Sequence, residues 1–358
     1  PLLRPLPLVP APGGLTMNQT PESRRFHEAV MAEEVIELFR SLQEGLIVDT
    51  TFGGGGHSRR LLEALGNEVR ILAFDRDPDA ITEADRRNSV TTPDPRLRIV
   101  HRNFREMNQV LTELNIGSFS GALFDLGVSS HQIEEGTRGF SYRIPGPLDM
   151  RMGPDAPHTA DELVNDWPEA ELAAVIRAYG EEPFATRIAR AIVAARPIGD
   201  TVQLADIIRA AIPAAKRRTG GHPARKTFQA LRIAANDELG ALEEGLDAAL
   251  DRLLSGGRCV AISYHSLEDR IVKRRFAAGA TGCTCPPGFP VCVCEATAEL
   301  RLLTRKPLRP TPDEVLASGR GCLGGSLCFE SGLTPFLLAL SFRGSHGVRR
   351  YKANPPIR

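Results

Sequence analysis

The stretch LIVDTTFGGGGHS at positions 46–58 decides the fold of this 358-residue chain. Three apolar residues, 46–48, form a short strand that ends at Asp49, and four consecutive glycines follow. A glycine turn between a strand and a helix lets a ligand approach the backbone and the free N–H groups of the helix. The stretch therefore predicts the first strand, ligand-binding turn and helix of a Rossmann-like α/β sheet.

The pattern of an apolar strand followed by an acid recurs along the chain. Residues 71–74 end at Asp75, residues 98–100 read as the next strand, and residues 122–124 end at Asp125. Short apolar strands that alternate with helices are typical of a parallel sheet covered on both faces. Because Asp75 ends the second strand about 20 residues after the glycines, we expect it to bind a ribose diol.

Hydrophobic periodicity divides the chain into four parts. Residues 159–212 are helical in period and show no strand, which predicts an all-helical domain inserted into the sheet domain. We expect a disordered extension at 1–21, the sheet domain at 22–132 and 226–312, the inserted substrate-recognition domain at 133–225, and a divergent, disordered tail at 313–358.

Composition sets broad limits on function. Lys plus Arg and Asp plus Glu both number 44, so no net charge attracts the chain to RNA as a whole. No stretch is long and apolar enough to cross a bilayer. One stretch without acids concentrates positive charge and is a candidate RNA-binding surface, with a solvated face as the alternative: Lys216, Arg217, Arg218, Arg225, Lys226 and Arg232.

Four of the seven cysteines lie in one short segment. Cys283, Cys285, Cys292 and Cys294 form two Cys-x-Cys pairs, and an odd total does not indicate a secreted disulfide framework. The segment could close a structural zinc site, form two local disulfides or remain reduced. We predict no metal in the catalytic chemistry.

The glycine turn suits NAD or S-adenosylmethionine (SAM). His57 and Ser58 stand where a dinucleotide fold needs small residues for close helix packing, which favours SAM. At the end of the fourth strand, Asp125 could accept a hydrogen bond from an exocyclic amine and increase its nucleophilicity, or it could cap the following turn. Ser129 and Gln132 offer further hydrogen bonds there.

Long motifs resemble the bacterial small-subunit rRNA cytosine N4-methyltransferases of the MraW/RsmH family. The resemblance covers about residues 27–318. Its motifs are HEAVM at 27–31, DTTFGGGGHS at 49–58, FDRDP at 74–78, NF at 103–104, FDLGVSSHQ at 124–132, RGFSY at 138–142, GPLDMRM at 146–152, YGEE at 179–182, HPARKTFQALRIAANDEL at 222–239, GGR at 256–258, ISYHSLEDRIVK at 262–273 and RKP at 305–307.

The resemblance implies a class I SAM-dependent methyltransferase fold with an inserted helical domain. It implies that SAM contacts Gly55, Gly56, His57, Asp75, Phe104, Asp125 and Gln132, and Gly54 belongs to the same turn. The implied substrate is a decoding-region cytidine of 16S rRNA, free or in the assembled small subunit, methylated at N4 in the bacterial cytoplasm. Motif residues expected to serve catalysis are Asp125, Ser129, Asn236 and His265, although structural roles stay open for the last two.

The chain departs from this family after Ser318, where GRGCLGGSLCFES occupies 319–331. A native tail and a shifted reading frame both stay open as explanations. Competing functions are an NAD(P)-dependent oxidoreductase on a similar sheet and a non-catalytic RNA-binding ribosome assembly factor. Whether the chain forms a homodimer is also left open.

Overall fold

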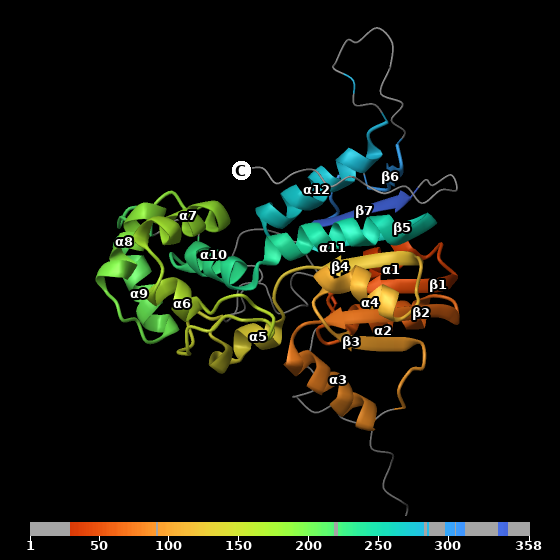
Figure 1. Ribbon diagram of the computed structural model, residues 1–358, viewed down its shortest axis with the longest axis horizontal. Helices are drawn as coiled ribbons and strands as arrows, with labels where there is room; N and C mark the ends of the chain where they lie inside the picture. The colour runs from red at the N-terminus through yellow and green to blue at the C-terminus, as the bar shows by residue number, and fades with distance from the viewer. Residues whose placement is uncertain are drawn as a thin grey trace, which may run out of the picture.

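The computed structural model describes residues 29–90, 92–217, 221–282, 285, 298–304, 306–311 and 336–342. Its centre is a seven-stranded sheet in the order β3-β2-β1-β4-β5-β7-β6 (Figure 1). The strands are β1 Glu44–Asp49, β2 Glu68–Asp75, β3 Leu97–His101, β4 Phe119–Asp125, β5 Leu253–Ser263, β6 Leu300–Leu302 and β7 Phe336–Phe342. Strands β1 to β5 are parallel, and β7 runs antiparallel to β5 and β6. The predicted α/β class and Rossmann-like sheet are confirmed.

Helices cover both faces of the sheet. One face carries α1 (Ala32–Phe39), α2 (Gly56–Ala64) and α3 (Pro78–Val90), and the other carries α4 (Met107–Glu113), α11 (Glu238–Arg252) and α12 (Ser266–Ala280). Successive strand residues point to opposite faces, so Ile47 packs in the core under α1 and α2 while Val48 packs in the core under α4 and α11. Both faces are therefore buried, as continuous apolar strands require.

A separate helical core lies beside the sheet, between β4 and β5 in the chain (Figure 1). It contains α6 (Ala160–Asn165), α7 (Glu169–Gly180), α8 (Ala185–Ala194), α9 (Thr201–Ala211) and α10 (Arg225–Asn236), while the short α5 (Ser130–Glu134) leads toward it. The domain boundary predicted at residue 226 assigns α10 to the sheet domain, but this helix packs in the second core. Phe228, Leu231 and Ala235 recur at helical spacing and turn one face of α10 toward the insert.

The C-terminal segment contains a strand where we expected disorder. Residues 336–342 pair with β5 in a regular antiparallel register, from Phe336 opposite Ser263 to Ser341 opposite Arg258. Leu337 and Ala339 face one core and Leu338 and Leu340 the other, so the segment has the period of a buried strand. The expectation of a disordered tail was wrong for these seven residues. The expected extension at 1–21 lies outside the described residues. Within the described part of the chain, no helix has the length and apolar character needed to span a membrane.

Candidate active site

A pocket opens at the carboxyl ends of the parallel strands. It lies where the strand order reverses between β1 and β4, which is where open α/β sheets bind ligands. We call it the first pocket. Its lining includes most of the predicted cofactor and catalytic residues: Gly54, Gly56, His57, Asp75, Phe104, Asp125, Ser129 and Gln132. Four separate parts of the sequence are thereby brought together.

The glycine turn holds its shape through positive backbone angles. Gly55 has φ 71° and forms the N-cap of α2, and a Cβ atom built there would lie 2.5 Å from the Phe52 ring. The Gly53 N–H donates to Oδ2 of Asp75 at 2.6 Å. Gly55 itself does not line the first pocket, so its role is to let the neighbouring glycines do so.

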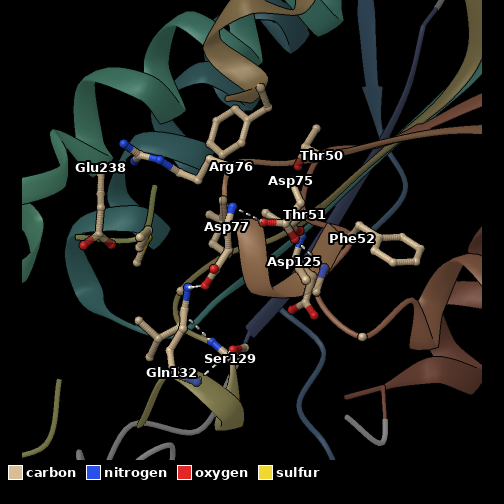
Figure 2. Close-up of a pocket in the computed structure, with 18 of the residues that line it drawn as sticks. Thr50, Thr51, Phe52, Asp75, Arg76, Asp77, Asp125, Ser129, Gln132 and Glu238 are labelled. Carbon is tan, nitrogen blue, oxygen red and sulfur yellow. Dashed lines mark hydrogen bonds between the residues drawn. The ribbon is translucent and has the colours of Figure 1, made fainter. Parts of the chain in front are cut away.

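Asp75 is the acid at the end of β2. Burial raises the pKa of its carboxyl to about 6, although the N–H groups of Asp77 and Gly53 work in the opposite direction. The chain of contacts continues through Asp77, whose Oδ2 accepts a hydrogen bond from Gln132 Nε2 at 2.6 Å (Figure 2). Gln132 and Ser129 form the capping box of α5, so these two predicted residues also fix the start of that helix.

Sequence reasoning gave no role to Asp49, which ends β1 beside the turn. It is fully buried, accepts hydrogen bonds from Ser58 Oγ at 2.6 Å and the Thr51 N–H at 3.2 Å, and thereby connects β1 to α2. Burial raises the pKa of Asp49 to about 6 against these hydrogen bonds and the charge of His57. The position of Asp49 at a strand end next to the glycines is the sequence feature that could have identified it as a site residue.

The raised pKa of Asp49 predicts that the effect of Asp49→Asn on the free energy of unfolding depends on pH. Between about pH 4 and pH 6 the folded wild type keeps a proton that the unfolded chain has lost, so its stability falls as pH rises through this window. Wild type should therefore lose about 2 kcal/mol of unfolding free energy relative to Asp49→Asn between pH 4 and pH 7. Urea denaturation across this range tests it, with exposed Asp85→Asn as the flat control. A difference in unfolding free energy between wild type and Asp49→Asn that does not change with pH would contradict the claim that burial raises the pKa of Asp49.

Asp125, at the end of β4, is held from three sides. Its backbone N–H donates to Thr51 Oγ1 at 3.1 Å, and its Oδ1 accepts a hydrogen bond from the Tyr264 hydroxyl at 2.8 Å. His57 Nε2 lies 3.4 Å from Oδ2. Burial alone would lower the pKa of His57, but the contact with Asp125 and the charges of Asp125 and Asp49 raise it above its usual value. Tyr264 was not among the predicted site residues.

One wall of the first pocket is apolar. Phe104 packs edge-to-face on Phe124, with ring centroids 5.8 Å apart, and a Cβ built on Gly245 of α11 would lie 2.5 Å from the Phe104 ring. Ala241 and Leu242 of α11 extend this wall. The wall can contact a flat aromatic ring.

A second pocket adjoins the first and shares Gly127, Val128 and Tyr264 with it. We call it the second pocket. The insert and the loop before it supply its aromatic residues Phe140, Tyr142 and Phe228, and its polar residues are Arg225, Gln229, Arg232 and His265. An aromatic pocket with a few polar groups suits a planar base. Arg225, Arg232 and His265 were among the residues predicted from the sequence, whereas the aromatic residues of this pocket were not.

An ion-pair cluster stands between the two pockets. Glu238, His265 and Glu268 place one ligand atom each within 4.8 Å of one another, a spacing that a metal could use. However, both Glu238 oxygens accept hydrogen bonds from the Arg232 guanidinium, at 2.8 and 2.9 Å. His265 Nδ1 accepts the Glu268 N–H at 3.3 Å, and its Nε2 lies 3.1 Å from Glu268 Oε1. These contacts already engage the groups, so we describe a buried ion-pair cluster.

This arrangement changes the expected role of His265. It lines the second pocket but not the first, and it caps the start of α12. Burial would raise the pKa of Glu268, but the charge and hydrogen bond of His265 and the charge of Arg232 hold it below its usual value. An ionised Glu268 thus fixes the His265 ring at the boundary between the pockets.

Asn236, also predicted as catalytic, does not reach either pocket. It is fully buried, its Oδ1 accepts the Met152 N–H at 2.7 Å, and its Nδ2 donates to the carbonyls of Met150 and Arg232. Its side chain therefore ties the loop before α6 to the end of α10. These three hydrogen bonds to the backbone favour a structural role for Asn236, and its catalytic assignment stays a prediction.

Asn236→Ala should consequently act on stability. The substitution leaves the buried Met152 N–H and Met150 carbonyl without their side-chain partner, at a cost of about 2–4 kcal/mol in unfolding free energy. Urea denaturation measures this, with exposed Asn88→Ala as the control that changes little. A fully stable Asn236→Ala chain that had lost its activity would restore the catalytic interpretation.

The predicted RNA-binding residues make different contacts and do not form one common surface among the residues that the structure describes. Arg217 donates to the carbonyls of Ala210 and Ile212 at the end of α9, Lys226 donates to the Glu181 carbonyl, and Arg232 belongs to the buried cluster. Arg225 lines the second pocket. Arg218 lies outside the described residues, as do Cys283, Cys292 and Cys294 of the proposed zinc segment.

Comparison with known proteins gives a consistent result. Residues 24–321 match the MraW methylase family. A protein of Heliobacterium modesticaldum named "Ribosomal RNA small subunit methyltransferase H" is 50% identical over 298 residues, covering 82% of this chain and 95% of the relative. Proteins with the same name from Symbiobacterium thermophilum and Geobacter sulfurreducens are each 50% identical over 297 residues, covering 82% of this chain and 93% and 95% of those relatives. On this match across most of its length, the chain belongs to the MraW methylase family.

Proposed function

We propose that this protein transfers a methyl group from SAM to N4 of a cytidine in small-subunit rRNA. The observation that carries the proposal is Asp125, a carboxylate held at the junction of the first and second pockets by His57 and Tyr264. The names of the curated relatives support rRNA of the small subunit as the substrate. The N4 position follows from the family resemblance and from the fit of an exocyclic amine to a carboxylate acceptor.

The residues of the first pocket fit SAM. The turn at Gly54 and Gly56 permits close approach of the ligand, Asp75 would accept hydrogen bonds from the ribose hydroxyls, and the Phe104 wall would contact the adenine. SAM supplies an electrophilic methyl group on a positively charged sulfur. Asp75 and Asp125 bring negative charge to this pocket, whereas Asp77 is paired with Arg138, Glu238 with Arg232 and Glu268 with His265.

The same charges argue against a nicotinamide dinucleotide. A pyrophosphate would carry two negative charges into a pocket that holds Asp75 and Asp125, and Arg76, which also lines it, is engaged with Asp155 at 2.9 Å. A cationic sulfonium gains from the same field. The electrostatics therefore favour methyl transfer over the oxidoreductase alternative.

Asp125 would act on the amine during transfer. Its carboxylate accepts an N–H of the exocyclic amine and orients the nitrogen lone pair toward the methyl group. The nitrogen forms its bond to the methyl carbon as the carbon–sulfur bond breaks, and the bond pair stays on sulfur. The nitrogen then gives up one proton, for which Asp125 is the adjacent acceptor. The cytidine must leave its stack to place its base in the second pocket.

Mass spectrometry of small-subunit rRNA after incubation with methyl-labelled SAM tests the proposal. We expect one labelled cytidine carrying the methyl group on N4, with free rRNA and assembled small subunits compared as substrates. Label at a ring carbon or on another base would overturn the N4 assignment, and no label on either substrate would overturn the methyltransferase function. Cytoplasmic location and a homodimer stay predictions.

A further inference from the structure

The loop at 150–155, which leads toward α6, forms part of the wall of the first pocket. Met152 lines this pocket and is buried, with 7% of its surface exposed. Gly153 lies so close to the end of β2 that a Cβ atom there would stand 2.3 Å from the Arg76 carbonyl oxygen. The loop belongs to the region between β4 and β5, so the insert contributes directly to the cofactor pocket.

Arg138, the first residue of the RGFSY motif, joins this loop to the start of α3. Its Nη2 donates to the main-chain carbonyls of Arg151 and Met152, at 3.0 and 3.2 Å. Its Nη1 donates to Asp77 Oδ1 at 3.0 Å and also to the carboxylate of Asp79. The planar guanidinium makes these contacts at the same time because its donors point in several fixed directions.

Asp77 connects Arg138 to a predicted cofactor residue. It lines the first pocket, and its Oδ2 accepts a hydrogen bond from Gln132 Nε2 at 2.6 Å (Figure 2). The other end of the loop is held by Asp155, whose carboxylate pairs with Arg76 at 2.9 Å. The loop is thus fixed at both ends, and Arg138 connects it to the side of the pocket that carries Gln132.

We propose that Arg138 is a positioning residue for SAM, which holds the 150–155 loop on the start of α3 and so keeps Met152 in the wall of the cofactor pocket. This inference rests on the proposed function, in which SAM is the ligand of the first pocket. A methionine side chain is apolar and adaptable, so it can pack against a bound ligand once its backbone is fixed. Without the guanidinium, the carbonyls of Arg151 and Met152 lose this donor and the loop loses its connection to α3.

Arg138→Met removes the guanidinium and keeps an unbranched side chain. The Kd for SAM in calorimetric titration should rise about tenfold, the effect of losing hydrogen bonds to charged groups. The single-turnover rate of methyl transfer to small subunits at saturating SAM should stay within about threefold, because Asp125 is unaltered. Arg190→Met, at an exposed arginine of α8, is the matched control and should leave both quantities unchanged.

A double variant tests whether Arg138 acts through Met152. Met152→Ala alone should raise the Kd for SAM about threefold, since it removes apolar contact with the ligand. In the Arg138→Met background the same change should add less than about 1.5-fold, because the loop no longer holds the side chain at the ligand. Full, independent effects of the two substitutions would overturn the inference.

Hydrogen exchange of the unaltered chain provides a measurement that does not depend on the folding of a variant. SAM should slow exchange of the amides at 150–155 and leave those of α8 unchanged. Unchanged exchange at 150–155, or a wild-type Kd for Arg138→Met, would overturn the inference while leaving the proposed function intact. Normal SAM binding without transfer to rRNA would overturn the proposed function alone, and absence of SAM binding by the unaltered chain would overturn both.

Discussion

Asp125→Ala should lower kcat for methyl transfer by at least about 100-fold while the protein remains folded. The carboxylate lines the first pocket and contacts Tyr264, which lines both pockets, and its loss removes both the orientation of the amine and the adjacent proton acceptor. The Kd for SAM should rise by no more than about tenfold, the value of a single hydrogen bond. Single-turnover rates at saturating SAM, together with calorimetric SAM titration, separate the two quantities.

Asp125→Asn provides a graded comparison. It keeps the shape and one acceptor oxygen but cannot take up the proton as a carboxylate does, so its rate should lie between wild type and Asp125→Ala. Exposed Asp85→Ala on α3 is the control for loss of a carboxylate elsewhere. A wild-type rate for Asp125→Ala would remove this residue from the mechanism.

Gly55→Val should reduce SAM affinity by more than about 100-fold. Gly55 has φ 71°, a conformation that a β-branched residue adopts only under strain, and the added Cβ would lie 2.5 Å from Phe52 and 2.7 Å from the Arg59 guanidinium. The turn and the start of α2 must shift, which moves Gly54 and Gly56 away from the ligand. Calorimetric SAM titration is the measurement.

Gly117→Val is the matched control for this substitution. A Cβ atom at Gly117 meets nothing within 4 Å, so SAM affinity and folding should both be retained. Circular dichroism would verify that Gly55→Val still folds, because the strain is confined to one turn. SAM binding by Gly55→Val within about threefold of wild type would mean that the glycine turn does not bind the cofactor.

Features that are local in sequence were predictable. The strand ends at Asp75 and Asp125 and the glycine turn can each be identified from a few consecutive residues. Parallel strands bring their carboxyl ends to one edge of the sheet, which places these residues together. The direct partners of Asp125 were harder to foresee. Tyr264 lies 139 positions away from Asp125, and only the pairing of β4 with β5 brings them together.

The expectations that failed concern residues whose local sequence pattern fits either of two environments, so that only tertiary packing decides between them. The helix α10 follows the insert in sequence and precedes α11, and its periodicity alone does not reveal which core its apolar face joins. Asn236 sits at its end, so a motif residue that looked chemical proved to bind backbone groups of the preceding loop. The presence of a residue in a motif indicates that it matters, but it does not show whether the residue serves folding or catalysis.

The position of β7 should also limit strand pairing between β5 and other copies of the protein. With β4 on one side and β7 on the other, β5 has its main-chain groups paired along Arg258 to Ser263. A chain cut at residue 321, where the family match ends, would lose β7 and leave β5 as a long apolar border of the sheet. Such borders can pair with strands of neighbouring molecules, so we expect a chain without β7 to aggregate more readily than the full chain.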